Sequence, residues 1–192
     1  PTPAPTQART VLVAKGIASG KKAMKISWNK VAGADRYVIY MSKCNYKGKK
    51  YTEKAVKTVN GNTFKWTKKK LKKKTCYKFY VVAQKKTASG YTTIATSNEG
   101  HALTSNRRGK STNPKSLKLK KASFTLSKGG SATIKGTVKK AKKGKKLLTT
   151  HEPLLRYISN NPAVATVAAN GKVTAKSSGT AVIYVQTING IW

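Results

Sequence analysis

LKKKTCYKFYVVA, residues 71–83, contains the clearest strand of this 192-residue chain. From Cys76 to Ala83 the stretch is rich in aromatic and β-branched residues, which favour a pleated, half-buried strand. Six similar runs precede or follow it, between turns of Gly, Asn and Lys: VLVA (11–14), AMKISW (23–28), RYVIYMS (36–42), KAVKTV (54–59), TFKWT (63–67) and YTTIATS (91–97). Seven short strands without a helix-period stretch predict a β-sandwich.

The positions of the aromatic residues and of one leucine indicate which kind of β-sandwich this is. The order Trp28, Tyr37, Leu71, Tyr77 resembles the pattern of a fibronectin type III domain. The family's core Trp falls on Trp28, its strand C aromatic on Tyr37, and its Leu and corner Tyr on Leu71 and Tyr77. The resemblance covers about residues 9–104 and implies an immunoglobulin-like sandwich.

A second stretch, RYISNNPAVATVAANGKVTAKSSGTAVIYV (156–185), is similar to the bacterial immunoglobulin-like group 2 family. Asn170-Gly171 between two strand-like runs is a strong hairpin signal. The alternation predicts core positions for Val164, Val167, Val173, Val182 and Tyr184. Two features depart from the family: Tyr157 stands at its usual Trp position, and the strand expected after Asn189-Gly190 is missing before Trp192.

Polar stretches divide the chain. We predict a Pro/Thr-rich linker at 1–8, the fibronectin type III-like domain at 9–104, an interdomain linker at 105–114, and the group 2 domain at 115–192. The fold class is therefore all-β, with two tandem immunoglobulin-like β-sandwiches. The resemblance implies a piece of a large secreted or wall-attached protein of a Gram-positive, often gut-dwelling, bacterium. In such proteins these modules act as spacers, adhesive units or carriers beside other domains.

Charge points to the partner class. The chain has 41 Lys and Arg against four Asp and Glu, a formal charge of +37. Such a chain accumulates on polyanions. Only five of its cations are arginines, whose planar fork reads phosphate or guanine bidentately, so the composition favours diffuse, salt-sensitive attraction over sequence readout.

Two lysine clusters are the candidate polyanion contacts, and we expect both to be loops. Their lysines are Lys68, Lys69, Lys70, Lys72, Lys73 and Lys74 in KKKLKKK, and Lys139, Lys140, Lys142, Lys143, Lys145 and Lys146 in VKKAKKGKKLL, after the second strand of the second domain. Three alternatives remain: solvated surface, lysines that stop strand edges from pairing with other chains, and a nuclear-localisation or nucleic-acid patch.

Pairing of the third and sixth strands gives two further predictions. If Tyr37 lies opposite Ala83, then Cys44 faces Cys76 on the outward phase, and we predict a disulfide that closes a loop of about 33 residues. The alternative is two free thiols. The same register pairs Tyr40 with Tyr80 on the outer face, either as an aromatic platform for sugar rings or as a plain cross-strand pair.

The sequence offers few candidates for catalytic residues. The acids are Asp35, Glu53, Glu99 and Glu152, and the histidines are His101 and His151. We expect no paired carboxylates, no metal cluster, no calcium site and no cofactor. The nearest constellation, His151-Glu152-Pro153, we interpret as a loop anchor.

We therefore expect a non-catalytic, monomeric, extracellular or cell-wall-associated module without membrane insertion. It would bind an anionic cell-wall polymer or host glycan through its lysines and position a neighbouring domain of a longer polypeptide. The alternatives are a pure structural spacer with no ligand and a non-specific nucleic-acid binder.

Overall fold

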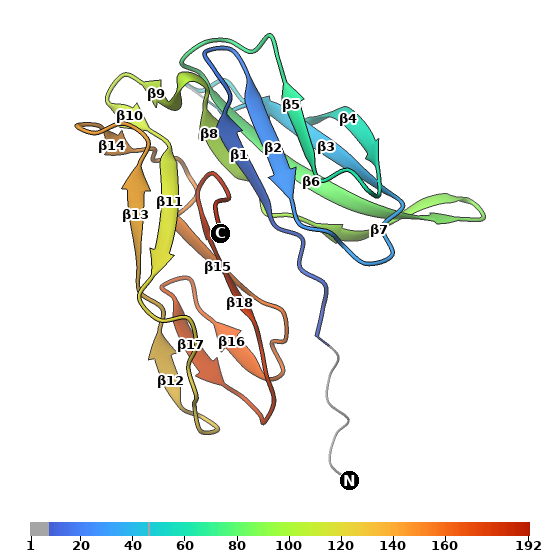
Figure 1. Ribbon diagram of the computed structural model, residues 1–192, viewed down its shortest axis with the longest axis vertical. Helices are drawn as coiled ribbons and strands as arrows, with labels where there is room; N and C mark the ends of the chain where they lie inside the picture. Colours follow the sequence, from blue (N-terminus) through green and yellow to red (C-terminus); the bar gives the residue numbers. More distant parts are fainter. Residues whose placement is uncertain (1–7, 46) are drawn as a thin grey trace.

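Two β-sandwiches follow one another along the chain in the computed structural model, which describes residues 8–45 and 47–192 (Figure 1). The predicted N-terminal linker lies outside this range except for Ala8, which is exposed. Apart from one short 3-10 helix, the regular structure in the described residues is β-strand. The all-β prediction with tandem sandwiches is confirmed.

The first sandwich has two sheets. One has the order β1-β2-β5, with β1 (Ala14–Ala18), β2 (Met24–Trp28) and β5 (Lys65–Lys68). The other has the order β4-β3-β6-β7, with β8 also paired to β6; its strands are β3 (Arg36–Lys43), β4 (Lys54–Asn60), β6 (Cys76–Thr87), β7 (Gly90–Thr96) and β8 (Gly100–Leu103). Both β7 and β8 pair with the long β6, so one edge of this sheet is a strand interrupted after Thr96.

The resemblance placed four residues in the core of the first sandwich, and all four are buried there. Trp28, Tyr37, Leu71 and Tyr77 belong to one apolar cluster. The two tyrosines also use their hydroxyl groups: Tyr37 accepts a hydrogen bond from the Val31 amide (2.8 Å), and Tyr77 accepts one from the Lys72 amide (3.0 Å). A buried tyrosine needs such a partner, so these bonds fix the loops beside the core.

The register of β3 and β6 is the one predicted, with Tyr37 opposite Ala83. Just beyond β3, Cys44 is joined to Cys76 by a disulfide, with Cα atoms 5.3 Å apart. The sulfurs are not at the solvent surface that an outward phase implied. Leu103 and Leu148 pack against them, because the second sandwich covers this end of the sheet.

We predict that replacing Cys44 and Cys76 together by alanine lowers the free energy of unfolding by about 2–4 kcal/mol, because the loop they close gains freedom in the unfolded chain. Urea denaturation measures this loss, and reduced wild-type protein should match the variant. A loss well below about 1 kcal/mol would show that the cross-link adds little.

The predicted interdomain linker is ordered. It contains the 3-10 helix η1 (Thr104–Asn106), β9 (Arg107–Arg108) and β10 (Ser111–Thr112), and a two-residue strand from the second sandwich, β14 (Lys146–Leu147), adds to them in the order β14-β10-β9. Asn113 is buried, and its side chain bonds to both backbone groups of Leu103 (2.7 and 2.8 Å). The linker is thus a packed junction.

The second sandwich is built from short ladders. Its strands are β11 (Pro114–Leu119), β12 (Ser131–Thr133), β13 (Gly136–Lys140), β15 (Leu155–Ser159), β16 (Ala165–Val167), β17 (Lys172–Ala175) and β18 (Ile183–Thr187). They pair as β11-β13, β12-β17-β16 and β15-β18. The hairpin predicted at Asn170-Gly171 joins β16 to β17, and Gly171 has a φ of 83° there, as such a turn needs.

Core positions of the second sandwich are only partly as predicted. Val173 is buried, and Val167 packs against the same cluster. Val182 and Tyr184 were placed inside, which is wrong: Val182 is 49% exposed, whereas Ile183 and Val185 join the core. Because side chains alternate along a strand, a shift by one residue exchanges the two faces of β18.

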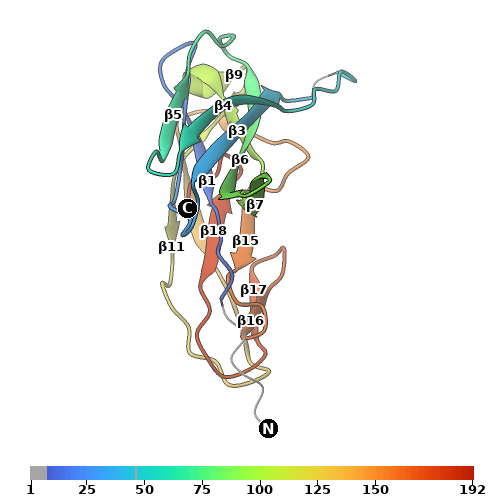
Figure 2. The same cartoon turned by 90° about the vertical axis from the view of Figure 1, so that its right-hand side faces the viewer.

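The turn after β18 docks into the first sandwich. Asn189 accepts a hydrogen bond from the Gly16 amide of β1 (2.9 Å), and Ile188 accepts one from the His101 amide of β8 (2.8 Å). The Asn189 side chain donates back to Gly16 O (3.2 Å) and to Pro114 O (3.3 Å). This turn bridges edges of both sheets of the first sandwich. Figure 2 shows β18 rising into that junction.

Candidate anion-binding groove

A groove of about 650 Å³ lies where the two sandwiches meet, and lysines from both predicted clusters line it. Its lining consists of Ala18, Gly20, Lys21, Lys73, Lys74, Ser105, Asn106, Arg107, Lys142, Lys143 and Lys145. Seven of these described residues are cationic and none is acidic. Clusters about 70 positions apart in the sequence therefore face one space.

The first wall comes from the first sandwich. Lys21 lies in the turn between β1 and β2, and Lys73 and Lys74 lie in the loop between β5 and β6. Leu71 anchors this loop, because its side chain is buried in the core and its amide donates to Lys22 O (2.8 Å). The apolar residue inside the lysine run thus holds the two turns side by side.

The opposite wall is the loop between β13 and β14, which carries Lys142, Lys143 and Lys145. Backbone hydrogen bonds tie its ends to the linker: the Ala141 amide donates to Asn113 O (2.9 Å), and the Lys146 amide donates to Lys110 O (2.9 Å). The lysines of the second sandwich are therefore positioned through the junction.

Between the walls, the backbone adopts a rarely populated conformation. Lys74, Ser105 and Asn106 have φ values of 54°, 62° and 52°, in the left-handed region. For residues with a Cβ this region costs about 1–2 kcal/mol each. Hydrogen bonds hold the segment, from Ser105 Oγ to Lys21 O (3.0 Å) and from Thr112 Oγ1 to Asn106 O (2.7 Å). Strain of this kind is concentrated at ligand sites.

Not all predicted contact residues line the groove. Lys68, Lys69, Lys70 and Lys72 do not, and neither do Lys139, Lys140 and Lys146. The prediction that both clusters are wholly loops is wrong. Lys68 ends β5 in the first cluster; in the second, Lys139 and Lys140 end β13 and Lys146 begins β14. The second cluster also follows the third strand of its domain, not the second.

Lys21 and Arg107 were not predicted to take part. Each lies outside the two lysine runs, and only the docking of the two sandwiches brings it to the groove. The sequence carries no local signal for such a position.

Tyr40 and Tyr80 form a stacked pair on the outer face of the β3–β6 ladder, with ring centroids 4.7 Å apart and an interplanar angle of 6°. Both are half-buried, and neither lines the groove. Burial raises the pKa of the Tyr80 hydroxyl, and the neighbouring Tyr40, Glu53 and Glu99 add to that rise.

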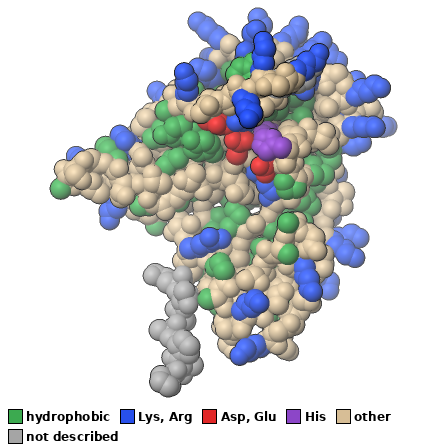
Figure 3. All heavy atoms as spheres, turned by 180° about the vertical axis from the view of Figure 1, so that it is seen from behind, with side chains coloured by type: hydrophobic (Ala, Val, Ile, Leu, Met, Phe, Trp, Pro, Cys, Tyr) green, Lys and Arg blue, Asp and Glu red, His purple; other side chains and the backbone are tan. Residues whose placement is uncertain are grey.

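The acids and histidines, for which the sequence predicted no paired carboxylates and no metal cluster, lie close together. Glu53, Glu99 and Glu152 gather with His101 and His151 where the sandwiches meet. The hollow between the two parts of the molecule in Figure 3 shows red and purple side chains together. Glu53, Glu99 and His101 belong to the first sandwich, whereas His151 and Glu152 come from the loop before β15. Spacing in the sequence could not reveal this grouping.

Parts of this chain are similar to known proteins. Residues 152–188 match a family model described as the intimin immunoglobulin-like domain. The FN1–FN3 domains of chicken CNTN1 are similar over 52% of this chain and 33% of that chain, at 19% identity and a TM-score of 0.41. The FN5 domain of Drosophila Lar is similar over 55% of this chain and 98% of that chain, at 19% identity and a TM-score of 0.38. The chain thus spans about a third of the first structure.

A search of curated protein sequences found no relative. Within residues 8–45 and 47–192, no helix has the length and apolar character that crossing a membrane requires.

Proposed function

We propose that this chain is a non-catalytic module of a secreted or cell-surface bacterial protein that binds anionic polymers through the groove between its two sandwiches. The observation that supports this most strongly is the convergence of seven cations on one space, six from the two sandwiches and one from the segment that joins them. Lysines held close together repel one another, and a polyanion relieves that repulsion while releasing counterions. Cell-wall polymer or host glycan is the ligand class we favour.

The likeness of residues 152–188 to an intimin immunoglobulin-like domain supports a surface, adhesion-type role. The motifs from Tyr157 to Tyr184 support the finer assignment to the bacterial group 2 family of lysine-rich surface proteins in Gram-positive gut bacteria. We propose a monomer that binds polymer and also positions a neighbouring domain of a longer polypeptide.

A pure spacer is the second candidate, and the docked turn at Asn189 favours it. Backbone bonds from Asn189 and Ile188 to two strands of the first sandwich would keep the interdomain axis fixed. A spacer needs no ligand, so binding data separate the two functions.

The test compares two variants of equal charge. In the groove variant, glutamine replaces five lining lysines: Lys73, Lys74, Lys142, Lys143 and Lys145. In the control variant, glutamine replaces five exposed lysines elsewhere: Lys25, Lys57, Lys65, Lys118 and Lys172. Each variant changes the formal charge from +37 to 37 minus 5, or +32. Binding to wall teichoic acid, heparin, mucin glycan and duplex DNA is measured over a series of salt concentrations.

We expect the groove variant to bind at least about tenfold more weakly than the control at low salt. For DNA, the slope of the log binding constant against the log salt concentration should also be less steep. We expect a change of about 0.9 for each phosphate that the variant no longer neutralises. If binding to all four polymers is weakened equally in both variants, the lysines are a general coat and the spacer function is favoured. A preference for DNA over wall polymer of matched charge would favour the nucleic-acid alternative.

A further inference from the structure

The junction between the sandwiches also holds a cluster of carboxylates and imidazoles, whereas the groove is lined by cations. Three of the four acids of the chain, Glu53, Glu99 and Glu152, meet both of its histidines there. In a chain of formal charge +37, this places most of the carboxylates at one point. Both imidazoles and one carboxylate offer the donor atoms of a metal site.

Glu99, His101 and His151 contribute those atoms. Glu99 Oε1 lies 2.7 Å from His101 Nε2 and 3.9 Å from His151 Nε2, and the three donor atoms all lie within 4.8 Å of one another. Two ligands of a tetrahedral zinc ion, each about 2.0–2.1 Å from the metal, are about 3.3–3.4 Å apart. The two distances from Glu99 Oε1 to the imidazoles bracket this value, so small side-chain rotations would meet it.

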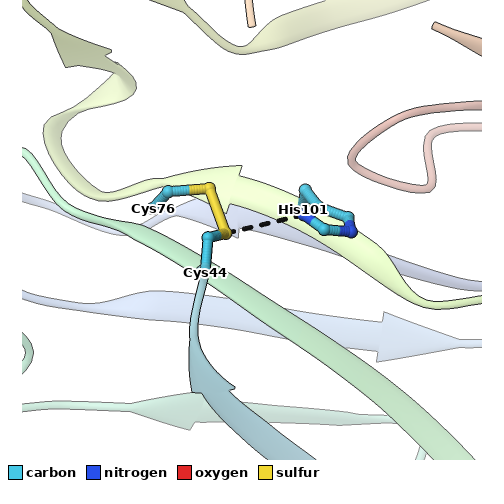
Figure 4. A group of neighbouring side chains, drawn as sticks. All are labelled: Cys44, Cys76 and His101. Carbon is cyan, nitrogen blue, oxygen red and sulfur yellow. Dashed lines mark hydrogen bonds between the residues drawn. A yellow bond between two sulfur atoms is a disulfide. The ribbon is translucent and has the colours of Figure 1, made fainter. Parts of the chain in front are cut away.

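The contact with the disulfide indicates which ring nitrogen of His101 carries a proton (Figure 4). His101 Nδ1 lies 3.5 Å from Cys44 Sγ, and this sulfur carries no hydrogen because it is bonded to Cys76. The contact can therefore be a hydrogen bond only if Nδ1 carries the proton and donates it. In the neutral ring, Nε2 then presents a lone pair toward Glu99.

A lone pair facing a carboxylate oxygen at 2.7 Å is repulsive unless a cation lies between them. That cation is either a proton on Nε2 or a metal ion. His101 is completely buried, and its Nε2 lacks a well-aligned hydrogen bond despite the short distance to Glu99. Ligating histidines commonly donate their second ring N–H to a neighbouring acceptor, which here is the disulfide sulfur.

Lys78 Nζ lies 3.8 Å from Glu99 Oε2, so Oε1 is the carboxylate oxygen that faces the two imidazoles. Glu152 Oε1 lies 3.6 Å from His151 Nε2, so it could complete a four-coordinate set. The side chain of His151 is 58% exposed and leaves a path for an ion to enter.

We propose that Glu99, His101 and His151 bind a divalent transition metal of the zinc class, with Glu152 or water as the fourth ligand. Two imidazoles and a carboxylate suit zinc better than magnesium or calcium, which prefer oxygen ligands. Since His151 belongs to the second sandwich and the other two ligands to the first, the ion would join the sandwiches. The proposal does not depend on polyanion binding.

The test is calorimetric titration of Zn²⁺ into tag-free protein at neutral pH, with Mg²⁺ as a second probe. We expect one Zn²⁺ per chain, no heat from Mg²⁺, and a rise in melting temperature with Zn²⁺ because binding stabilises the folded state. NMR signals from the imidazoles of both histidines should shift with the same midpoint.

His151→Gln is the informative variant, because its exposed side chain can be replaced without disturbing the core. It should weaken Zn²⁺ binding by at least about tenfold and remove the melting-temperature shift. Asp35→Asn removes the one acid outside the cluster and should bind like wild type. Undetectable Zn²⁺ binding by wild-type protein, or equal affinity in His151→Gln, would overturn the proposal.

Discussion

Replacing Gly190 by alanine is expected to lower the free energy of unfolding by about 2–4 kcal/mol and to undock the second sandwich. Gly190 has a φ of 83°, and a Cβ there would lie 1.9 Å from Ala14 O in the backbone of β1. Neither the turn nor β1 can yield easily, because Asn189 and Ile188 are hydrogen-bonded to strands on both sides.

Gly33→Ala is the matched control. Gly33 has a similar φ of 75°, but a Cβ there would meet no heavy atom within 4 Å. The control therefore carries the conformational cost without the clash. Urea denaturation followed by tryptophan fluorescence should show a clearly larger loss for Gly190→Ala. Equal losses in the two variants would mean that the contact with β1 adds nothing.

Lys78→Met is expected to cost about 3–5 kcal/mol, the usual loss when one partner of a buried ion pair is removed. Lys78 is a buried lysine near the start of β6; its Nζ lies 2.5 Å from Glu53 Oε1 and 3.8 Å from Glu99 Oε2. Without the ammonium group, two carboxylates face each other with little solvent to screen them.

A double variant, Lys78→Met with Glu53→Gln, should recover much of that stability, because it removes the uncompensated charge. Lys85→Met, on the exposed end of the same strand, should stay within about 0.5 kcal/mol of wild type. Thermal and urea denaturation of wild type, the single variants Lys78→Met and Glu53→Gln, and the double variant give the coupling energy. A loss below about 1 kcal/mol for Lys78→Met would show that water already compensates the charges.

The first sandwich was predictable because its signals are local. Alternation along each strand, together with Trp28, Leu71 and Tyr77, specified which faces are buried, and the β3–β6 register followed from one assumed pair. The second sandwich has shorter ladders and a smaller core, so periodicity was weaker. The face of β18 was accordingly assigned one residue out of phase, which placed Val182 wrongly inside.

The groove and the acid–histidine cluster depend on docking, which no local pattern encodes. Lys21 and Arg107 join the predicted lysines only because the junction is folded, and His151 meets His101 only across it. The sequence shows directly that the chain has only four acids. It could not show that a sheet edge from one domain and a loop from the other place them together.

The contact between Gly16 and Asn189 joins residues 173 positions apart in the chain. Each sandwich closes through much nearer partners, so this contact forms late, after loop closure has been achieved elsewhere. During synthesis on the ribosome, the first sandwich emerges before the turn that covers β1 and β8 exists. For that interval the amides of Gly16 and His101 face solvent, and a nascent chain on a neighbouring ribosome could pair with these edges. Crowded translation is therefore a condition that exposes these two strand edges to misassembly.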